Sequence, residues 1–197
     1  ETTTHVSGRE RCDDLLMAAD IINENKFTYS ERQVFMIYDS YFVASLQKIF
    51  GDELSSNIDY IMKTFTIDEL FEDVIIMMKR RGGKTIGTAV YLACFATTQL
   101  KANINVYGKS KRVTKMMKEV VKECYLELKA SGKFEPTEIV EDNDERLSIK
   151  TRHGNVNVIN FYPCNSDVRE PLAVFGWNVC SLEQFAVFKS LEFPLVP

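Results

Sequence analysis

A glycine pair followed by a lysine and a threonine is the clearest chemical signal in this chain. These four residues, Gly82 to Thr85, come directly after the basic triplet 79–81 and the apolar run 74–78. Small residues let backbone N–H groups wrap around phosphate oxygens, a lysine reaches the terminal phosphates, and a hydroxyl group holds a magnesium ion. The order of residue types therefore predicts a loop that binds the triphosphate of a nucleotide.

A strand and a helix must hold such a loop in place. Residues 73–78 predict a buried-type strand before it, and the mostly apolar residues 85–94 predict a helix whose N-terminus faces the anion. The standard pattern would have a glycine at position 78, where this chain has Met78. The alternative interpretation is a basic turn between a strand and a helix that binds no ligand.

Composition limits the class of protein. A chain of 197 residues with 45% hydrophobic residues can bury one sizeable core, so we expect a single domain. The five cysteines are an odd number and are far apart, with no CxxC pair among them. This pattern is typical of reduced intracellular thiols. His5 and His153 lie in polar surroundings, where we expect solvated side chains and no metal cage. Because no apolar run is long enough to cross a membrane and no secretion signal is evident, we expect a soluble intracellular protein.

Periodicity divides the chain into helical and strand-forming parts. Helical spacing in the first seventy residues predicts three helices, over 13–22, 30–51 and 55–65. Beyond the loop, the pattern predicts a strand, a long helix, an acidic loop and a hairpin, over 104–108, 110–131, 132–144 and 147–161. Strands joined through a helix pair in parallel with a right-handed crossover, which places the loop at the carboxyl edge of an open sheet.

Residues 79–85 resemble the phosphate-binding motif of viral DNA-packaging terminase large subunits of the herpesvirus type, in which two arginines and a small or polar residue precede Gly-Lys-Thr. The strand ending at 106–110, the basic helix after it and the turn at His153-Gly154 also look similar to that family. The resemblance covers residues 70–162. It implies an α/β fold, a P-loop NTPase-like three-layer sandwich with a mostly parallel sheet that is incomplete at the C-terminus.

The same resemblance implies an organisation and a function. Residues 1–70 would be a helical segment leading into a partial ATPase core over 71–197, within one domain overall. The core would couple ATP hydrolysis to translocation of double-stranded DNA into a capsid, with ATP and Mg²⁺ as cofactors. Its implied partners are a portal, a small terminase subunit and further copies of itself, in a host nucleus. The alternatives are a helicase-like translocase and a nucleotide-binding module without turnover.

Roles for the loop residues follow from the resemblance. It implies that Lys84 contacts the β and γ phosphates, Thr85 holds the magnesium ion, and Gly82 and Gly83 form the phosphate cradle. Arg80 or Arg81 would spread its charge over the transferring phosphoryl oxygens, as an arginine finger does. The alternative is that these arginines are solvated or pair with acidic neighbours.

Two further candidates lie outside the loop. ATPases of this kind place a glutamine upstream to recognise adenine, and Gln33 has a suitable position, although it is equally suited to a capping box with Ser30. The closing acidic motif would be Glu183 at the magnesium position, followed by Gln184 where a carboxylate should polarise water. Because glutamine is neutral, hydrolysis would be slow. We favour the interpretation that the stretch from about Pro171 has diverged or is truncated.

The helix predicted over 110–131 carries a cationic face. Such a face could bind nucleic-acid phosphates without reading bases, as a translocating motor requires. The alternative is an ordinary amphipathic helix with solvated lysines. The basic residues concerned are Lys109, Lys111, Arg112, Lys115, Lys118, Lys122, Lys129 and Lys133.

Overall fold

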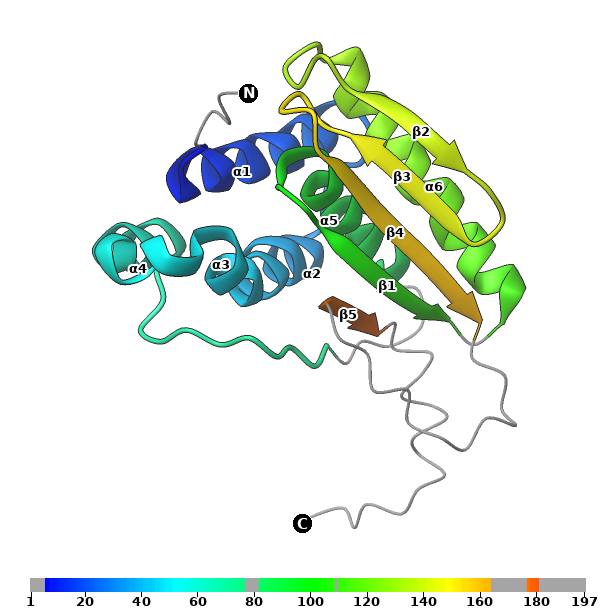
Figure 1. Ribbon diagram of the computed structural model, residues 1–197. Coiled ribbons are helices and arrows are strands. Elements are labelled where there is room, and N and C mark those ends of the chain that lie inside the picture. Colours follow the sequence, from blue (N-terminus) through cyan, green and yellow to red (C-terminus); the bar gives the residue numbers. More distant parts are fainter. Residues whose placement is uncertain (1–5, 77–81, 109, 164–176, 181–197) are drawn as a thin grey trace, which may run out of the picture.

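The computed structural model describes residues 6–76, 82–108, 110–163 and 177–180, and the last of these ranges only as backbone. The fold is α/β, as predicted (Figure 1). A five-stranded sheet has the order β2-β3-β4-β1-β5, with β1 Asn103–Gly108, β2 Glu138–Asp142, β3 Arg146–Lys150, β4 Val156–Pro163 and β5 Trp177–Cys180. The predicted strand over 104–108 and the predicted hairpin are both present.

The sheet is mixed rather than mostly parallel. Strand β1 pairs in parallel with β4 and β5, whereas β2 with β3 and β3 with β4 are antiparallel. Strand β2 occupies the stretch that we expected to be an acidic loop, because its residues alternate between half-buried and exposed positions beside β3. The described helices lie on one side of the sheet (Figure 1), so the third layer of the expected sandwich is not seen in the described residues.

Alternation along β1 decides which face is covered. Ile104 and Val106 are 1% and 2% exposed and belong to the core that also includes α5 (Lys84–Thr98) and α6 (Lys111–Ala130). On the opposite face, the Asn160 amide donates to the side-chain oxygens of Asn103 and Asn105 at 2.9 and 3.0 Å. Successive side chains of a strand point to opposite faces, so β1 gives the sheet one apolar and one polar face.

Helix α5 is the centre of the core, and a buried asparagine fixes its end. From Gly87 to Thr98 every residue of α5 is buried. The Asn157 amide donates to the carbonyl oxygens of Ala96 and Gln99 at 2.8 and 2.6 Å, and its oxygen accepts from the Ala102 N–H group at 2.7 Å. A helix leaves its last carbonyls without intrahelical donors, so Asn157 satisfies them and ties α5 to β4.

The N-terminal helices pack on α5. Helix α1 (Gly8–Asn25) begins five residues earlier than predicted, with Ser7 as its N-cap. The predicted helix over 30–51 is present but in three parts: α2 (Glu31–Val34), the π-helix η1 (Phe35–Phe42) and α3 (Val43–Phe50). Two short 3-10 turns, η2 (Gly51–Glu53) and η3 (Ser55–Asn57), lead into α4 (Ile58–Phe65).

The strand predicted over 73–78 does not form in its described part. Residues 73–76 have no strand assignment and pair with none of the described strands, and residues 77 and 78 lie outside the described residues. Branched apolar residues favour a strand only where a neighbouring strand and a packed face exist. The prediction was wrong here because the described sheet ends at β5 and offers this segment no partner.

Candidate functional site

The turn at Gly83 starts α5 in the way that the sequence predicts. Gly83 is the N-cap with φ 81° and ψ 10°, a left-handed conformation that glycine adopts without strain. Lys84 and Thr85 are the first two residues of the helix and are both half-buried. The first N–H groups of a helix have no intrahelical acceptors, and the helix dipole adds positive potential there. The predicted helix start is therefore confirmed to within one residue.

Gln33 lies against this turn. Its side-chain amide donates to the Gly83 carbonyl oxygen at 3.4 Å, and its side-chain oxygen accepts from the Ser30 N–H and hydroxyl groups, each at 3.0 Å. The capping box that we considered is therefore present. The contact with the glycine turn is present as well, and Gln33 is only 8% exposed. A Cβ atom at position 83 would lie 2.7 Å from the Gln33 Nε2 atom, so a side chain there would make the Gln33 side chain shift.

The π-helix η1 presses on the first turns of α5. A Cβ atom at Gly87 would lie 1.8 Å from the Met36 Cε atom, so glycine is what permits the close packing. The Tyr41 and Thr88 hydroxyl groups share a hydrogen bond at 3.0 Å, and the Tyr41 ring stacks on the Tyr91 ring with centroids 4.9 Å apart. Sequence reasoning missed η1, although π-helices occur often at functional sites.

The start of α5 and the last residues of β1 and β5 lie toward the same edge of the sheet. Helix α5 runs antiparallel to β1, so its N-terminus lies toward the end where β1 finishes (Figure 1). Strand β5 is parallel to β1 and finishes toward the same edge, with Cys180 paired to Tyr107. Strand β5 precedes Glu183 in the sequence, and the acidic motif considered there stays a prediction. Arg80, Arg81 and Glu183 themselves lie outside the described residues.

Most of the described lysines on α6 pair with two aspartates, one at the end of β2 and one just after it. Asp142 accepts from Lys118 at 2.6 Å and from Lys122 at 2.5 Å, and Asp144 lies 3.1 Å from Lys111. These hydrogen bonds, first from Lys118 and then from Lys122, hold the pKa of Asp142 below its ordinary value. Lys118 is only 5% exposed, so it is a structural residue and not the solvent-facing phosphate contact that we expected. The spacing along the helix could not reveal these partners, which come from β2 and the turn after it.

A second cluster joins α1 to the turn between β3 and β4. Ligand atoms of Glu10, Asp14 and His153 all lie within 4.8 Å of one another. The Arg152 guanidinium already lies among them, 2.5 Å from Asp14 and 3.4 Å from Glu10, and it donates to His153 at 3.2 Å. Burial raises the pKa of Asp14, and burial followed by the Arg152 charge lowers that of His153. His153 is half-buried rather than solvated as predicted, and the cluster is an ion pair that anchors α1.

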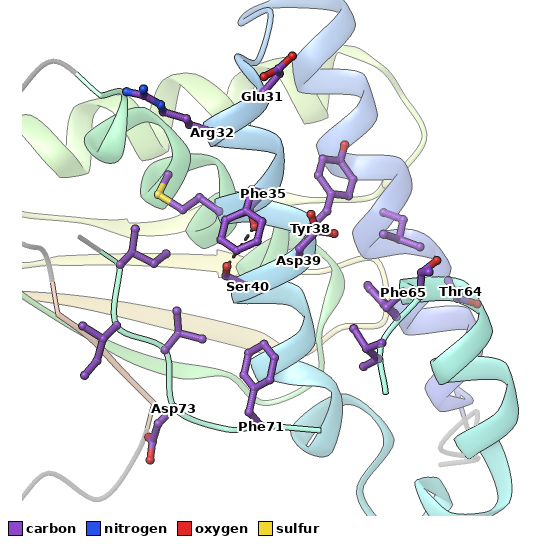
Figure 2. Close-up of a pocket in the computed structure, with 17 residues that line it drawn as sticks. Glu31, Arg32, Phe35, Tyr38, Asp39, Ser40, Thr64, Phe65, Phe71 and Asp73 are labelled. Carbon is purple, nitrogen blue, oxygen red and sulfur yellow. Dashed lines mark hydrogen bonds between the residues drawn. The ribbon is translucent and has the colours of Figure 1, made fainter. Parts of the chain in front are cut away.

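A groove opens between η1 and residues 64–76. Its volume is about 1340 Å³, and Phe35 from η1 and Phe71 from the extended segment both border it (Figure 2). Arg32 also lines the groove and belongs to α2, where it directly precedes Gln33 in the sequence. The sequence pattern did not predict this groove, because residues 73–78 were expected to form a buried strand inside a sheet.

Comparisons with known proteins gave no match, either to family models, to curated proteins or to solved structures. Among the described residues, no helix has the length and apolar character needed to span a membrane.

Proposed function

We propose that this chain is the nucleotide-binding portion of a terminase-type motor ATPase, in which the turn 82–85 holds the triphosphate of ATP. The observation that carries this proposal is the conformation of Gly83, which starts a buried helix whose first two residues are Lys84 and Thr85. Anions bind where helix N–H groups, a helix dipole and a lysine converge. The resemblance at residues 79–85 supplies the class of ATPase.

The residues of the turn fit ATP and Mg²⁺ chemically. The left-handed φ of 81° at position 83 favours glycine, and a Cβ atom there would also make the Gln33 side chain shift. In the proposal, the ammonium group of Lys84 attracts the β and γ phosphates and the hydroxyl of Thr85 coordinates Mg²⁺. The magnesium ion supplies neutralisation of phosphate charge. Gln33 positions the turn through Gly83, and its capping box keeps the side chain in one orientation.

Arg80, Arg81 and Glu183 have proposed roles that the sequence assigns. Either arginine would stabilise charge on the γ-phosphate, and Glu183 would complete the magnesium site at the edge where β5 finishes. The three-layer, P-loop NTPase-like arrangement belongs to the same proposal. It would require a further layer and strands beyond those described. The partners implied are double-stranded DNA, a portal, a small terminase subunit and further copies of the chain, in a host nucleus.

Asp142 at the end of β2 and Asp144 just after it limit where DNA would be held. Because they pair with Lys111, Lys118 and Lys122, these lysines of α6 are less available to phosphates than the sequence suggests. DNA binding would therefore rely on residues such as Arg112 and Lys129. Affinity should fall with rising salt, as for any contact dominated by phosphates.

Nucleotide binding is tested by thermal unfolding with Mg²⁺-ATP. Ligand at a hundred times its Kd adds about 2.7 kcal/mol to the free energy of unfolding, which raises the melting temperature by several degrees. Lys84→Ala should abolish this shift. Lys48→Ala, on the exposed side of α3, is the matched control and should retain it. An equal shift in the Lys84→Ala protein would overturn the proposal.

A nucleotide-binding module without turnover is the second candidate. It is favoured by Gln184, which follows β5 and is neutral at the position where a carboxylate would activate water. Phosphate release measured with and without double-stranded DNA separates the two. DNA-stimulated release supports a motor, whereas thermal protection without release supports the module.

A further inference from the structure

The groove beside η1 exposes apolar side chains that a folded domain normally covers. Phe35 is 61% exposed, Ile75 is 69% exposed and Phe71 is 36% exposed. Phe35 lines the groove from η1 and Phe71 from the segment 66–76 that follows α4 (Figure 2), and Ile75 of the same segment lines it too. Scattered apolar residues are normal on a surface, but apolar residues gathered in one concave site mark a binding surface.

Within the described residues, the backbone of the last part of this segment, residues 73–76, has no hydrogen-bond partner. Residues 73–76 read Asp-Val-Ile-Ile, a composition suited to a strand, and no described residue forms a backbone ladder with them. A chain whose N–H and C=O groups meet no described partner is a template to which another strand can add. The occupant of this site is therefore expected to be an extended segment rather than a helix.

Charge selects the kind of segment. Three carboxylates line the groove, Glu31, Asp39 and Asp73, against the single guanidinium of Arg32. The extended segment adds further exposed acids on the same stretch, at Asp68, Glu69 and Glu72. An acidic and apolar surface repels nucleic acids and anionic membranes and attracts lysine and arginine.

We propose that this groove binds an extended segment of another protein, in which branched or aromatic apolar side chains alternate with lysine or arginine. The segment adds as a strand beside residues 73–76. Its apolar side chains cover Phe35 and Ile75, and its basic side chains approach Asp73 and Asp39. This interaction is independent of the nucleotide site and does not involve Lys84.

The test measures the binding of four dye-labelled ten-residue peptides to the full chain by fluorescence anisotropy. One alternates isoleucine with lysine, the second alternates isoleucine with glutamate, and the third alternates serine with lysine. We expect the isoleucine-lysine peptide to bind at least ten times more tightly than either of the others. A fourth peptide has the first sequence but is methylated on alternate backbone nitrogens, and it should bind at least ten times more weakly because it cannot complete the ladder.

Variants locate the binding on the protein. Phe35→Ser, Ile75→Ser and Asp73→Lys should each weaken the isoleucine-lysine peptide at least fivefold. The matched controls are Leu126→Ser and Glu119→Lys on α6, where Leu126 is 51% exposed, and they should leave the affinity unchanged. All five positions are exposed, and melting temperatures verify that each variant folds.

Three results would overturn the proposal. Equal affinity for the serine-lysine and isoleucine-lysine peptides would show charge attraction alone. Equal weakening by the control variants on α6 would show that the peptide binds elsewhere or without a defined site. Retained binding by the methylated peptide would remove strand addition, and with it the proposed mode.

Discussion

The Gln33 side chain donates to the carbonyl oxygen of Gly83 across fifty residues of sequence. The same side chain closes the capping box with Ser30 at the start of α2. One amide therefore sets both the beginning of a helix and the position of the glycine turn. Its partial burial, at 8% exposed, keeps water from competing for these hydrogen bonds.

Comparing a Gln33 variant with a Ser30 variant should separate these two roles. Gln33→Ala removes the capping box and the Gly83 contact, and we expect it to lower the free energy of unfolding by about 1–2 kcal/mol and to weaken Mg²⁺-ATP at least fivefold. Ser30→Ala removes only the hydroxyl partner of the capping box and should leave nucleotide affinity near that of the unchanged protein. Denaturant unfolding and thermal shifts with nucleotide measure both. Equal nucleotide affinities in the two variants would assign Gln33 to capping alone.

Any side chain at position 83 should lower the free energy of unfolding. In Gly83→Ala the new Cβ atom meets the Gln33 amide and also sits at φ 81°, so strain and collision add. We expect a loss of about 1–3 kcal/mol in the free energy of unfolding. Gly132→Ala is the control, because Gly132 has φ 70° but no atom within 4 Å of the added Cβ, and it should lose about 1 kcal/mol from strain alone. A loss no larger at position 83 than at 132 would contradict the close approach.

Asp142 should make stability depend on pH in the acidic range. Its folded pKa lies below the ordinary value of 3.8, so its contribution is present above that value and disappears as the pH falls through the folded pKa. Asp142→Asn should lower the melting temperature at pH 7 and flatten the loss of stability below about pH 4. Asp144→Asn, at an exposed pair with Lys111, should change the melting temperature little. A steep acid transition that survives in Asp142→Asn would assign the pH dependence to other carboxylates.

Gly87 and Met36 should show strong coupling. Gly87→Ala places a methyl group where the Met36 Cε atom lies, and overpacking of this kind destabilises by about 1–3 kcal/mol. Met36→Ala alone leaves a cavity, because Met36 is fully buried. In the double variant the two defects compensate in part, so the loss should be smaller than the sum of the single losses. Additive losses in a denaturant series would show that the two residues do not meet.

The sequence predicted those elements whose defining residues are close together in the chain. The start of α5 follows from Gly83 and the apolar run after it, and the hairpin follows from alternation on both sides of a turn that contains Gly154 with φ 80°. Helix α6 begins, as predicted, with Ser110 as its N-cap. In each case the residues that define the element are neighbours in the sequence.

Features that depend on distant partners were beyond the sequence. The segment 73–76 has the composition of a strand, yet no described strand lies beside it, so composition alone misled. Lys118 belongs to a lysine-rich helix, but its role is decided by Asp142 from another element. The contact of Gln33 with Gly83 was not predicted, because it depends on how α2 lies against the start of α5.

The wide turns of η1 set the rotational phase between α2 and α3. Each residue of a regular helix turns the chain by about 100°, so deleting a single residue from Phe35–Phe42 would rotate α2 around its axis by roughly that amount. Gln33 would then swing away from Gly83, while Met36 would leave its place over Gly87. Insertions and deletions in this stretch should therefore be far less tolerated than substitutions, even at its exposed positions.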